Sequence, residues 1–132
     1  PRPPLARRPA RRGLRPALVL HYESLLRGQP NIELMSWSGR SSHHLFPVLV
    51  PRGKRDAVLD GLGERAIGAA VNYRAVHTLQ YYRERFGYES EAFPVAAEIG
   101  ERTLSLPLWP GMTTAQVERA ASALVDTLAR LA

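Results

Sequence analysis

The densest group of residues able to do chemistry lies over residues 72–78, NYRAVHT. Arg74 can hold a carboxylate or phosphate through two parallel hydrogen bonds. His77 can donate to an oxygen or move a proton near neutral pH, and Tyr73 offers an aromatic wall with a polar tip. These three residues are therefore candidate binding residues. The same pattern also suits a loop that is capped by its own side chains, with its aromatic residues in the core.

Other reactive side chains are sparse. The single lysine, Lys54, stands beside a turn and between polar neighbours, so we expect it to be solvated. A lysine that forms an imine with a cofactor needs a pKa lowered by burial or by neighbouring charges. The chain has no cysteine, which excludes disulfides and thiolate chemistry. His43 and His44 would point to opposite faces of a strand, so we expect no metal site, and no catalytic residue is assigned.

The elements that must position the candidate residues follow from hydrophobic spacing. Residues 17–27 predict a helix, because Leu18, Tyr22 and Leu26 repeat every four residues on one face. Strands are predicted over 32–35, 43–50 and 103–106, with another possible over 69–73. Further helices are predicted over 54–65, 77–86 and 94–101. Pro47 within the second strand favours an edge position or a bulge, since proline has no N–H to donate.

The last helix carries the strongest local signal. Thr113 as N-cap with Gln116 three residues later predicts a capping box, followed by a sustained apolar stripe to the end of the chain. Helices that outnumber short strands predict an α/β (α+β) two-layer sandwich, in which helices cover a small sheet of three to four strands.

The positive charge is concentrated at the beginning. The formal net charge of the 132 residues is +6, and residues 1–30 hold seven arginines but only one acidic residue. Residues 1–16 contain five prolines and six arginines, which predicts an extended, disordered tail before a domain over 17–132. No apolar run is long enough for a membrane span and no secretory signal is visible, so we expect a cytoplasmic chain without a membrane partner. We expect the tail to be solvated rather than bound to nucleic acid.

Residues 65–124 resemble the carboxy-terminal part of the DegT-type sugar aminotransferases. The motifs that carry the resemblance are VNYRAVHTLQYY (71–82), FPVAAEIGERTLSLPLWPGMT (93–113) and the final helix. Residues 41–62 look like the preceding strand and helix of that family, so the resemblance extends over about 17–131. Family members are pyridoxal-phosphate enzymes with the aspartate aminotransferase fold.

The resemblance implies a function for the whole enzyme. Members of the family transfer an amino group, usually from glutamate, to a keto group of a nucleotide-linked sugar for surface polysaccharides or antibiotics. This chain would be the small carboxy-terminal domain, whereas the large domain holds the imine-forming lysine and most of the pyridoxal phosphate site. We therefore expect no activity from the chain alone. Its partners would be nucleotide-sugar, glutamate or 2-oxoglutarate, and the missing large domain or a second copy.

By the same resemblance, the 72–78 loop approaches the substrate side of the active site. His77 is the first choice as a substrate contact, with Tyr73 and Arg74 next. Residues 1–16 depart from the long helix that the family has there. Leu104, Leu106, Leu108 and Trp109 are expected to be exposed where the large domain would pack, which favours self-association. The alternative function is a non-catalytic binding module whose arginine-rich arm contacts a polyanion.

Overall fold

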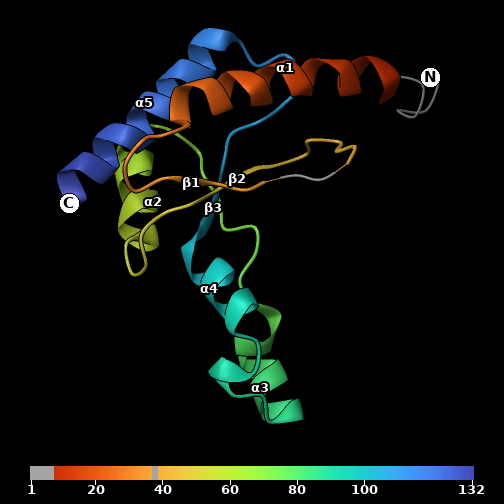
Figure 1. The fold of residues 1–132 in the computed structure, drawn as a ribbon, viewed down its shortest axis with the longest axis vertical. Helices are drawn as coiled ribbons and strands as arrows, with labels where there is room; N and C mark the ends of the chain where they lie inside the picture. The colour runs from red at the N-terminus through yellow and green to blue at the C-terminus, as the bar shows by residue number, and fades with distance from the viewer. Residues whose placement is uncertain (1–7, 37–38) are drawn as a thin grey trace.

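The computed structural model describes residues 8–36 and 39–132. Over these residues, five α-helices, three strands and two short 3₁₀ helices follow one another (Figure 1). In chain order they are α1 (Arg8–Leu26), β1 (Glu33–Leu34), β2 (Phe46–Leu49), α2 (Arg55–Glu64), η2 (Val76–Thr78), α3 (Gln80–Phe86), η3 (Ser90–Ala92), α4 (Pro94–Arg102), β3 (Thr103–Leu106) and α5 (Thr114–Leu131).

The three strands form an antiparallel sheet in the order β1-β2-β3. Phe46 pairs with Leu106, and Leu49 pairs with both Glu33 and Thr103. The possible strand over 69–73 does not form. Only Ala70 reaches the sheet, through an isolated bridge to Ser105 in which the two backbones exchange hydrogen bonds of 2.8 and 3.2 Å.

Helices α1, α2 and α5 enclose the core together with the sheet. Helix α5 packs against both α1 and α2, and Figure 1 shows α1 and α5 side by side above the strands. The Tyr22 ring stacks on Phe46 at a centroid distance of 4.6 Å, and its hydroxyl donates to the Pro107 carbonyl at 2.9 Å. Burial raises the pKa of this phenol. The predicted fold class, a small sheet covered by helices, is confirmed.

Helix α5 begins as its sequence predicts. The Thr113 hydroxyl accepts a hydrogen bond from the Gln116 backbone N–H at 3.3 Å, and the Gln116 side chain accepts one from the Thr113 N–H at 2.9 Å. This capping box satisfies two backbone donors that a helix start leaves without partners. The buried stripe along α5 then fills the core with Val117, Leu124 and Leu128.

Helix α1 is longer than predicted. Residues 8–16 are helical, so the prediction of an extended tail over 1–16 is wrong for them; residues 1–7 lie outside the described part of the chain. Pro16 lies inside the helix, where it removes one backbone hydrogen bond. The alanine, leucine and arginine residues around it are good helix formers, and burial of Leu18, Val19 and Tyr22 anchors the following turns.

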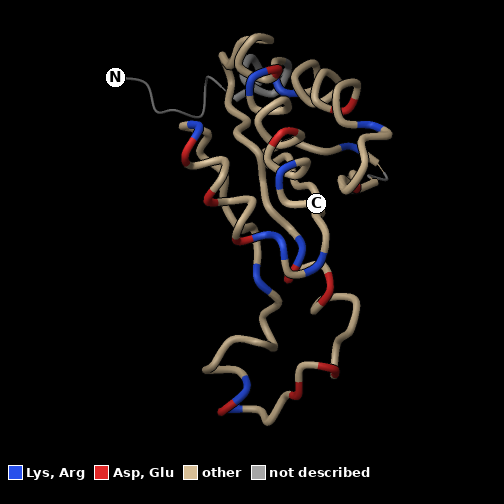
Figure 2. Tube along the Cα trace, turned by 90° about the vertical axis from the view of Figure 1, so that its left-hand side faces the viewer, with Lys and Arg blue, Asp and Glu red and all other residues tan. Residues whose placement is uncertain are grey.

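Residues 71–100 form an arm that extends away from the helices of the body (Figure 1). The arm contains η2, α3, η3 and most of α4, and it leaves the sheet after Ala70 and returns to it at β3. Acidic and basic positions are mixed along it (Figure 2). The arm therefore carries no field of a single sign, in contrast to the arginine-rich beginning of the chain.

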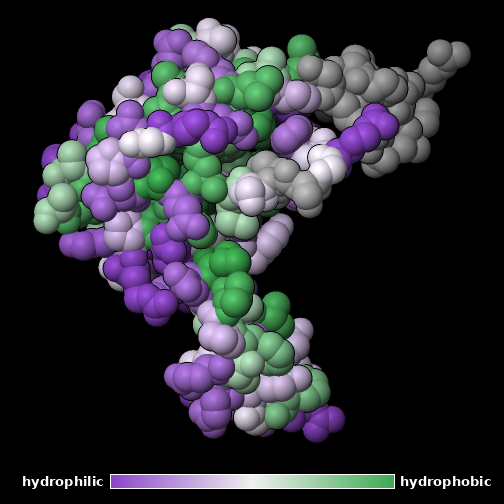
Figure 3. All heavy atoms as spheres, in the orientation of Figure 1, coloured by the Kyte–Doolittle hydropathy of each residue, from purple (hydrophilic) through white to green (hydrophobic). Residues whose placement is uncertain are grey.

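Most of the large exposed apolar side chains lie on this arm rather than on β3. Leu104 and Leu106 are 0% and 3% exposed because they belong to the body's own core, so the prediction that they are exposed is wrong. Leu108 is partly buried against the core, whereas Trp109 is 44% exposed. Apolar surface is visible where the arm meets the body (Figure 3). The exposed apolar residues of the arm are Tyr73, Val76, Leu79, Tyr81, Phe86, Tyr88, Phe93 and Val95.

Candidate functional site

The turn over residues 73–78 lies at the junction of the arm and the body, beside a pocket of about 460 Å³. Arg74 and Thr78 line this pocket, and Tyr73 next to them is 70% exposed. The peptide bond between Asn72 and Tyr73 is cis. The other lining residues come from the turn before α2, the start of α2, η3 and α4: Arg52, Arg55, Ser90, Glu91, Pro94, Ala97, Glu98, Gly100 and Glu101, together with Ala75 of the candidate turn.

Most charges around the pocket are already paired. Arg52 forms an ion pair of 2.9 Å with Glu101. The side chain of Arg55 is 11% exposed, and it binds Asp56 at 2.9 Å and donates to the Gly100 carbonyl at 2.7 Å. Among residues 8–36 and 39–132, Arg74 has no carboxylate within ion-pair distance. Its guanidinium is therefore available to an anionic ligand.

His77 is placed differently from the other two candidate residues, Tyr73 and Arg74. It is only 5% exposed and does not line the pocket. Its Nε2 lies 3.1 Å from the Ser90 carbonyl oxygen, and its ring lies 5.1 Å from the Phe93 ring at an interplanar angle of 60°. The structure thus brings Tyr73 and Arg74 to the surface, while His77 turns into the arm.

The turn is held by close backbone packing. The Ala75 carbonyl accepts hydrogen bonds from the Thr78 N–H at 3.1 Å and the Thr78 hydroxyl at 2.7 Å. Behind it, a Cβ atom on Gly100 would lie 2.5 Å from the Ala75 nitrogen. Sequence reasoning did not select Gly100 as part of the site. A glycine inside the helix predicted over 94–101 was the signal that could have found it, because such a glycine often marks a close approach of two backbones.

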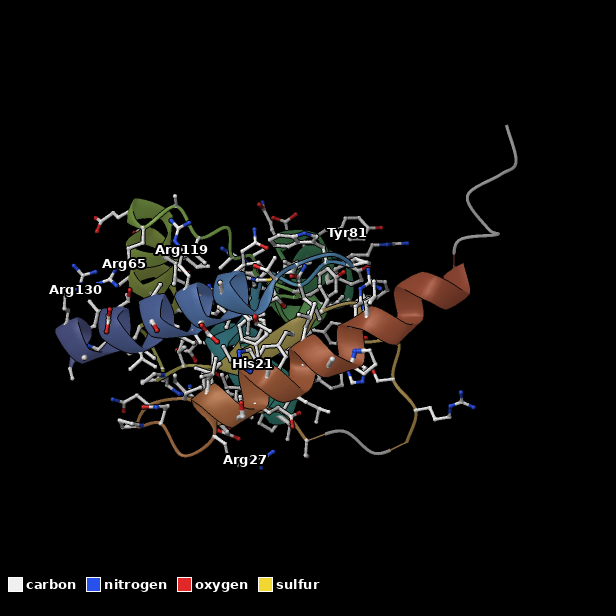
Figure 4. The ribbon with its side chains drawn as sticks, turned by 90° about the horizontal axis from the view of Figure 1, so that it is seen from above. His21, Arg27, Arg65, Tyr81, Arg119 and Arg130 are labelled. Atoms are coloured by element: carbon white, nitrogen blue, oxygen red, sulfur yellow. The ribbon has the colours of Figure 1, made fainter. Side chains whose placement is uncertain are left out.

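The aromatic residues of the arm pack on one another instead of entering the body's core. A chain of ring contacts, each with a centroid distance of 6.0 Å or less, runs from Tyr81 to His77. Figure 4, which views the molecule from above, shows Tyr81 away from Arg65, Arg119 and Arg130, which lie along α2 and α5. The rings in between belong to Tyr82, Phe86, Tyr88 and Phe93.

The other reactive side chains that the structure describes, Lys54, His43 and His44, do not gather into a second centre. Lys54 is exposed, and its Nζ donates to the Leu131 carbonyl at 2.8 Å near the end of α5. His43 and His44 precede β2, which begins only at Phe46, so the prediction that they lie in the strand is wrong. The backbone of His43 has a φ of 45°, which a strand does not permit. Within the described ranges, no three His, Asp or Glu residues gather as metal ligands, and none of the helices is both long and apolar enough to span a bilayer.

Comparison with known proteins gives a consistent result. The sequence profile of the DegT/DnrJ/EryC1/StrS aminotransferase family matches residues 5–125. The solved structure of the aminotransferase TlmJ from Streptoalloteichus hindustanus is 25% identical with a TM-score of 0.83, over 96% of this chain and 34% of that one. DesV from S. venezuelae is 29% identical with a TM-score of 0.83, over 92% and 33% of the two chains.

A third structure supports the fold at lower identity. PseC from Helicobacter pylori, an aminotransferase of pseudoaminic acid biosynthesis, is 22% identical with a TM-score of 0.86, over 96% of this chain and 35% of that one. This chain therefore spans about a third of the length of each of these structures. The matched residues 5–125 include all of α1, so the predicted departure of residues 1–16 from the family is not observed over the matched part.

Proposed function

This chain belongs to the DegT/DnrJ/EryC1/StrS aminotransferase family, and we propose that it is the carboxy-terminal portion of a sugar aminotransferase. The match over residues 5–125, with a fold shared by sugar aminotransferases over a third of their length, carries this proposal. The proposed reaction moves an amino group from glutamate to a keto group of a nucleotide-linked sugar, in the cytoplasm. The product would be an amino sugar for a surface polysaccharide or an antibiotic.

The residues present do not fit the covalent anchor of pyridoxal phosphate, the cofactor of this family. The cofactor forms an imine with a lysine, and the only lysine is Lys54. This side chain is exposed and hydrogen-bonded to the Leu131 carbonyl, whereas an imine-forming lysine is held in a desolvated site beside its cofactor. The large domain would therefore supply the anchor, and the chain alone would be inactive.

The contribution of this chain would be one wall of the substrate site. The exposed Arg74 guanidinium can bind the carboxylate of glutamate or 2-oxoglutarate, or a phosphate of the nucleotide-sugar. Tyr73, exposed beside it, offers a ring face and a hydroxyl. His77 was the first choice as a substrate contact, but its burial within the arm favours an indirect role. The exposed apolar residues of the arm would pack against the large domain or a second copy of the chain.

An activity assay tests the proposal. The chain is joined to the large domain of a sugar aminotransferase relative, and amino transfer from glutamate to a nucleotide-linked keto sugar is measured. We expect activity from the joined protein, and none from this chain or the large domain alone. Absence of activity in a soluble joined protein that retains bound cofactor would contradict the proposal. Steeply salt-dependent binding of heparin by the chain would instead support the polyanion-binding alternative.

A further inference from the structure

His77 links the two legs of the arm. One leg runs outward through η2 and α3, and the other returns through η3 and α4. Although 13 residues separate His77 from Ser90 in sequence, the imidazole Nε2 lies 3.1 Å from the Ser90 carbonyl oxygen. The Phe93 ring contacts the same imidazole from the returning leg. Both contacts hold the outward leg against the returning one just beyond the turn that carries Tyr73 and Arg74.

The chemistry of this contact fixes the state of the ring. A carbonyl oxygen can only accept a hydrogen bond, so Nε2 must carry the proton. In the neutral imidazole, Nδ1 then has the lone pair, and a single tautomer is present. A buried histidine that lost this bond would leave its own N–H without a partner, which is unfavourable away from water.

A second contact holds the other end of the turn. Ala75 lies against Gly100. The Gly100 carbonyl oxygen accepts a hydrogen bond of 2.7 Å from the Arg55 guanidinium. Gly100 therefore connects the turn to α4, and Arg55 connects α4 to the start of α2 in the body. The segment that follows the exposed pair Tyr73 and Arg74 is therefore held at two residues. Ala75 packs against Gly100, and His77 is hydrogen-bonded to Ser90.

We propose that His77 and Gly100 are positioning residues that hold Tyr73 and Arg74 in the orientation needed for substrate binding. This inference rests on the proposed function. A displacement of about 1 Å at a binding group can lower catalytic efficiency by about 100-fold, which is why a buried histidine without substrate contact matters here. His77 acts through the turn, and the substrate meets Tyr73 and Arg74.

The structural half of the proposal is tested on the 132-residue chain. Nitrogen chemical shifts of the imidazole, recorded by NMR with ¹⁵N-labelled histidine, should show that Nε2 of His77 carries a proton. Averaged shifts, typical of a ring that exchanges between tautomers, would overturn the assignment. Tyr81→Leu is the matched control, because it alters an exposed aromatic residue of the arm whose ring does not contact His77, and it should leave the His77 shifts unchanged.

The functional half uses the protein joined to a large domain. His77→Leu fills the buried position with an apolar side chain and removes the hydrogen-bond donor. We expect it to raise KM by about 10-fold or more, with a smaller change in kcat. His77→Gln restores an N–H donor and should recover most of the loss. Gly100→Ala should raise KM similarly without touching His77. Unchanged KM in His77→Leu and Gly100→Ala would overturn the inference.

The two possible failures are distinguishable. If Arg74→Ala impairs substrate binding but His77→Leu does not, the proposed function stands and the positioning role is wrong. If Arg74→Ala and Tyr73→Ala also leave both kinetic constants unchanged, the proposed substrate site is itself wrong, and the positioning role fails with it. If His77→Leu does not fold with a large domain, Gly100→Ala and His77→Gln still decide the positioning role.

Discussion

Gly100 of α4 and Ala75 of the candidate turn pack with almost no space between their backbones. A Cβ atom on Gly100 would stand 2.5 Å from the Ala75 nitrogen and 2.9 Å from the Ala75 Cβ. Backbone atoms cannot move aside as a flexible side chain can, so only glycine fits here without a shift of the turn. This contact fixes the candidate turn against α4 at the base of the arm.

Gly100→Ala should therefore destabilise the chain, although alanine favours a helix more than glycine does. Overpacking of this kind costs about 1–3 kcal/mol, which exceeds the gain of about 1 kcal/mol in helix propensity. Unfolding in urea measures the difference. Gly63→Ala is the control, because Gly63 also lies in a helix but has no atom within 4 Å of its added Cβ, and it should be neutral or stabilising. Equal effects of the two changes would contradict the prediction.

Thr113→Ala should weaken the start of α5. The change removes the hydroxyl that accepts from the Gln116 N–H, and loss of such a cap costs about 1 kcal/mol. The midpoint of urea unfolding should fall with an unchanged slope. Thr114→Ala removes the neighbouring exposed threonine, which does not cap the helix, and should change the midpoint little. A loss of equal size in the control would show that the capping bond is not the cause.

Tyr22→Phe should reduce stability near neutral pH and change its response to alkali. It keeps the stacking on Phe46 but loses the bond from the hydroxyl to Pro107, at about 1 kcal/mol. Burial raises the pKa of Tyr22 above its ordinary value of 10.0, so the unfolded chain loses this proton first and the folded chain loses stability as pH rises above 10.0.

The free energy of unfolding of both proteins is measured at about pH 8 and about pH 11. The native chain should lose more stability over this range than Tyr22→Phe does, because the variant has no phenol to ionise at that position. The other four tyrosines are common to both proteins and cancel in the comparison. An equal loss in the two proteins would contradict the assignment of the effect to Tyr22.

Arg74→Ala should impair substrate binding by the protein joined to a large domain. Loss of a hydrogen bond to a charged group costs about 1.5–3 kcal/mol, which corresponds to a KM raised by about 10-fold to 100-fold. Arg74→Lys should recover only part, since an ammonium group cannot form two parallel bonds to a carboxylate or phosphate. Arg83→Ala, an exposed change on the same arm that lies outside the pocket, should leave KM unchanged.

The chain on its own should self-associate through the arm. Phe86 and Val95 are 55% and 70% exposed, and apolar groups of this kind gain free energy when a second surface covers them. Light scattering after size exclusion should give a mass above that of the monomer, and Phe86→Ser with Val95→Ser should shift it toward 14.7 kDa. The control is Leu20→Ser, a 65% exposed position on α1. A sharp monomer peak of the unmodified chain at high concentration would contradict the prediction.

Local chemistry made part of the fold predictable. The start of α5 follows from Thr113 and Gln116, and β3 follows from the alternation over 103–106, because both signals depend on neighbours in sequence. Pro47 shows where this reasoning stops. It lies in the central strand β2 and not at an edge of the sheet. The short strand β1 pairs only with Val48 and Leu49 of β2, so on the β1 side no strand residue faces Pro47 and its missing N–H leaves no acceptor without a donor.

Long-range contacts decided the rest. Helix α1 continues through Pro16 because its later turns are buried against α5, which no local rule for proline includes. The sequence placed the three candidate site residues close together, but it could not tell which of their side chains face solvent. His77 is buried only because Ser90 and Phe93, on a separate leg of the arm, come back to meet it.

The bridge between Ala70 and Ser105 brings the two ends of the arm together at the edge of the sheet. A proteolytic cut near Gly87, in the exposed segment between α3 and η3, would therefore leave two fragments that each keep one side of the bridge. The fragment with α1, β1, β2 and α2 would remain docked on the fragment with β3 and α5, since their shared core lies entirely outside the cut segment. New chain ends introduced there would be tolerated for the same reason.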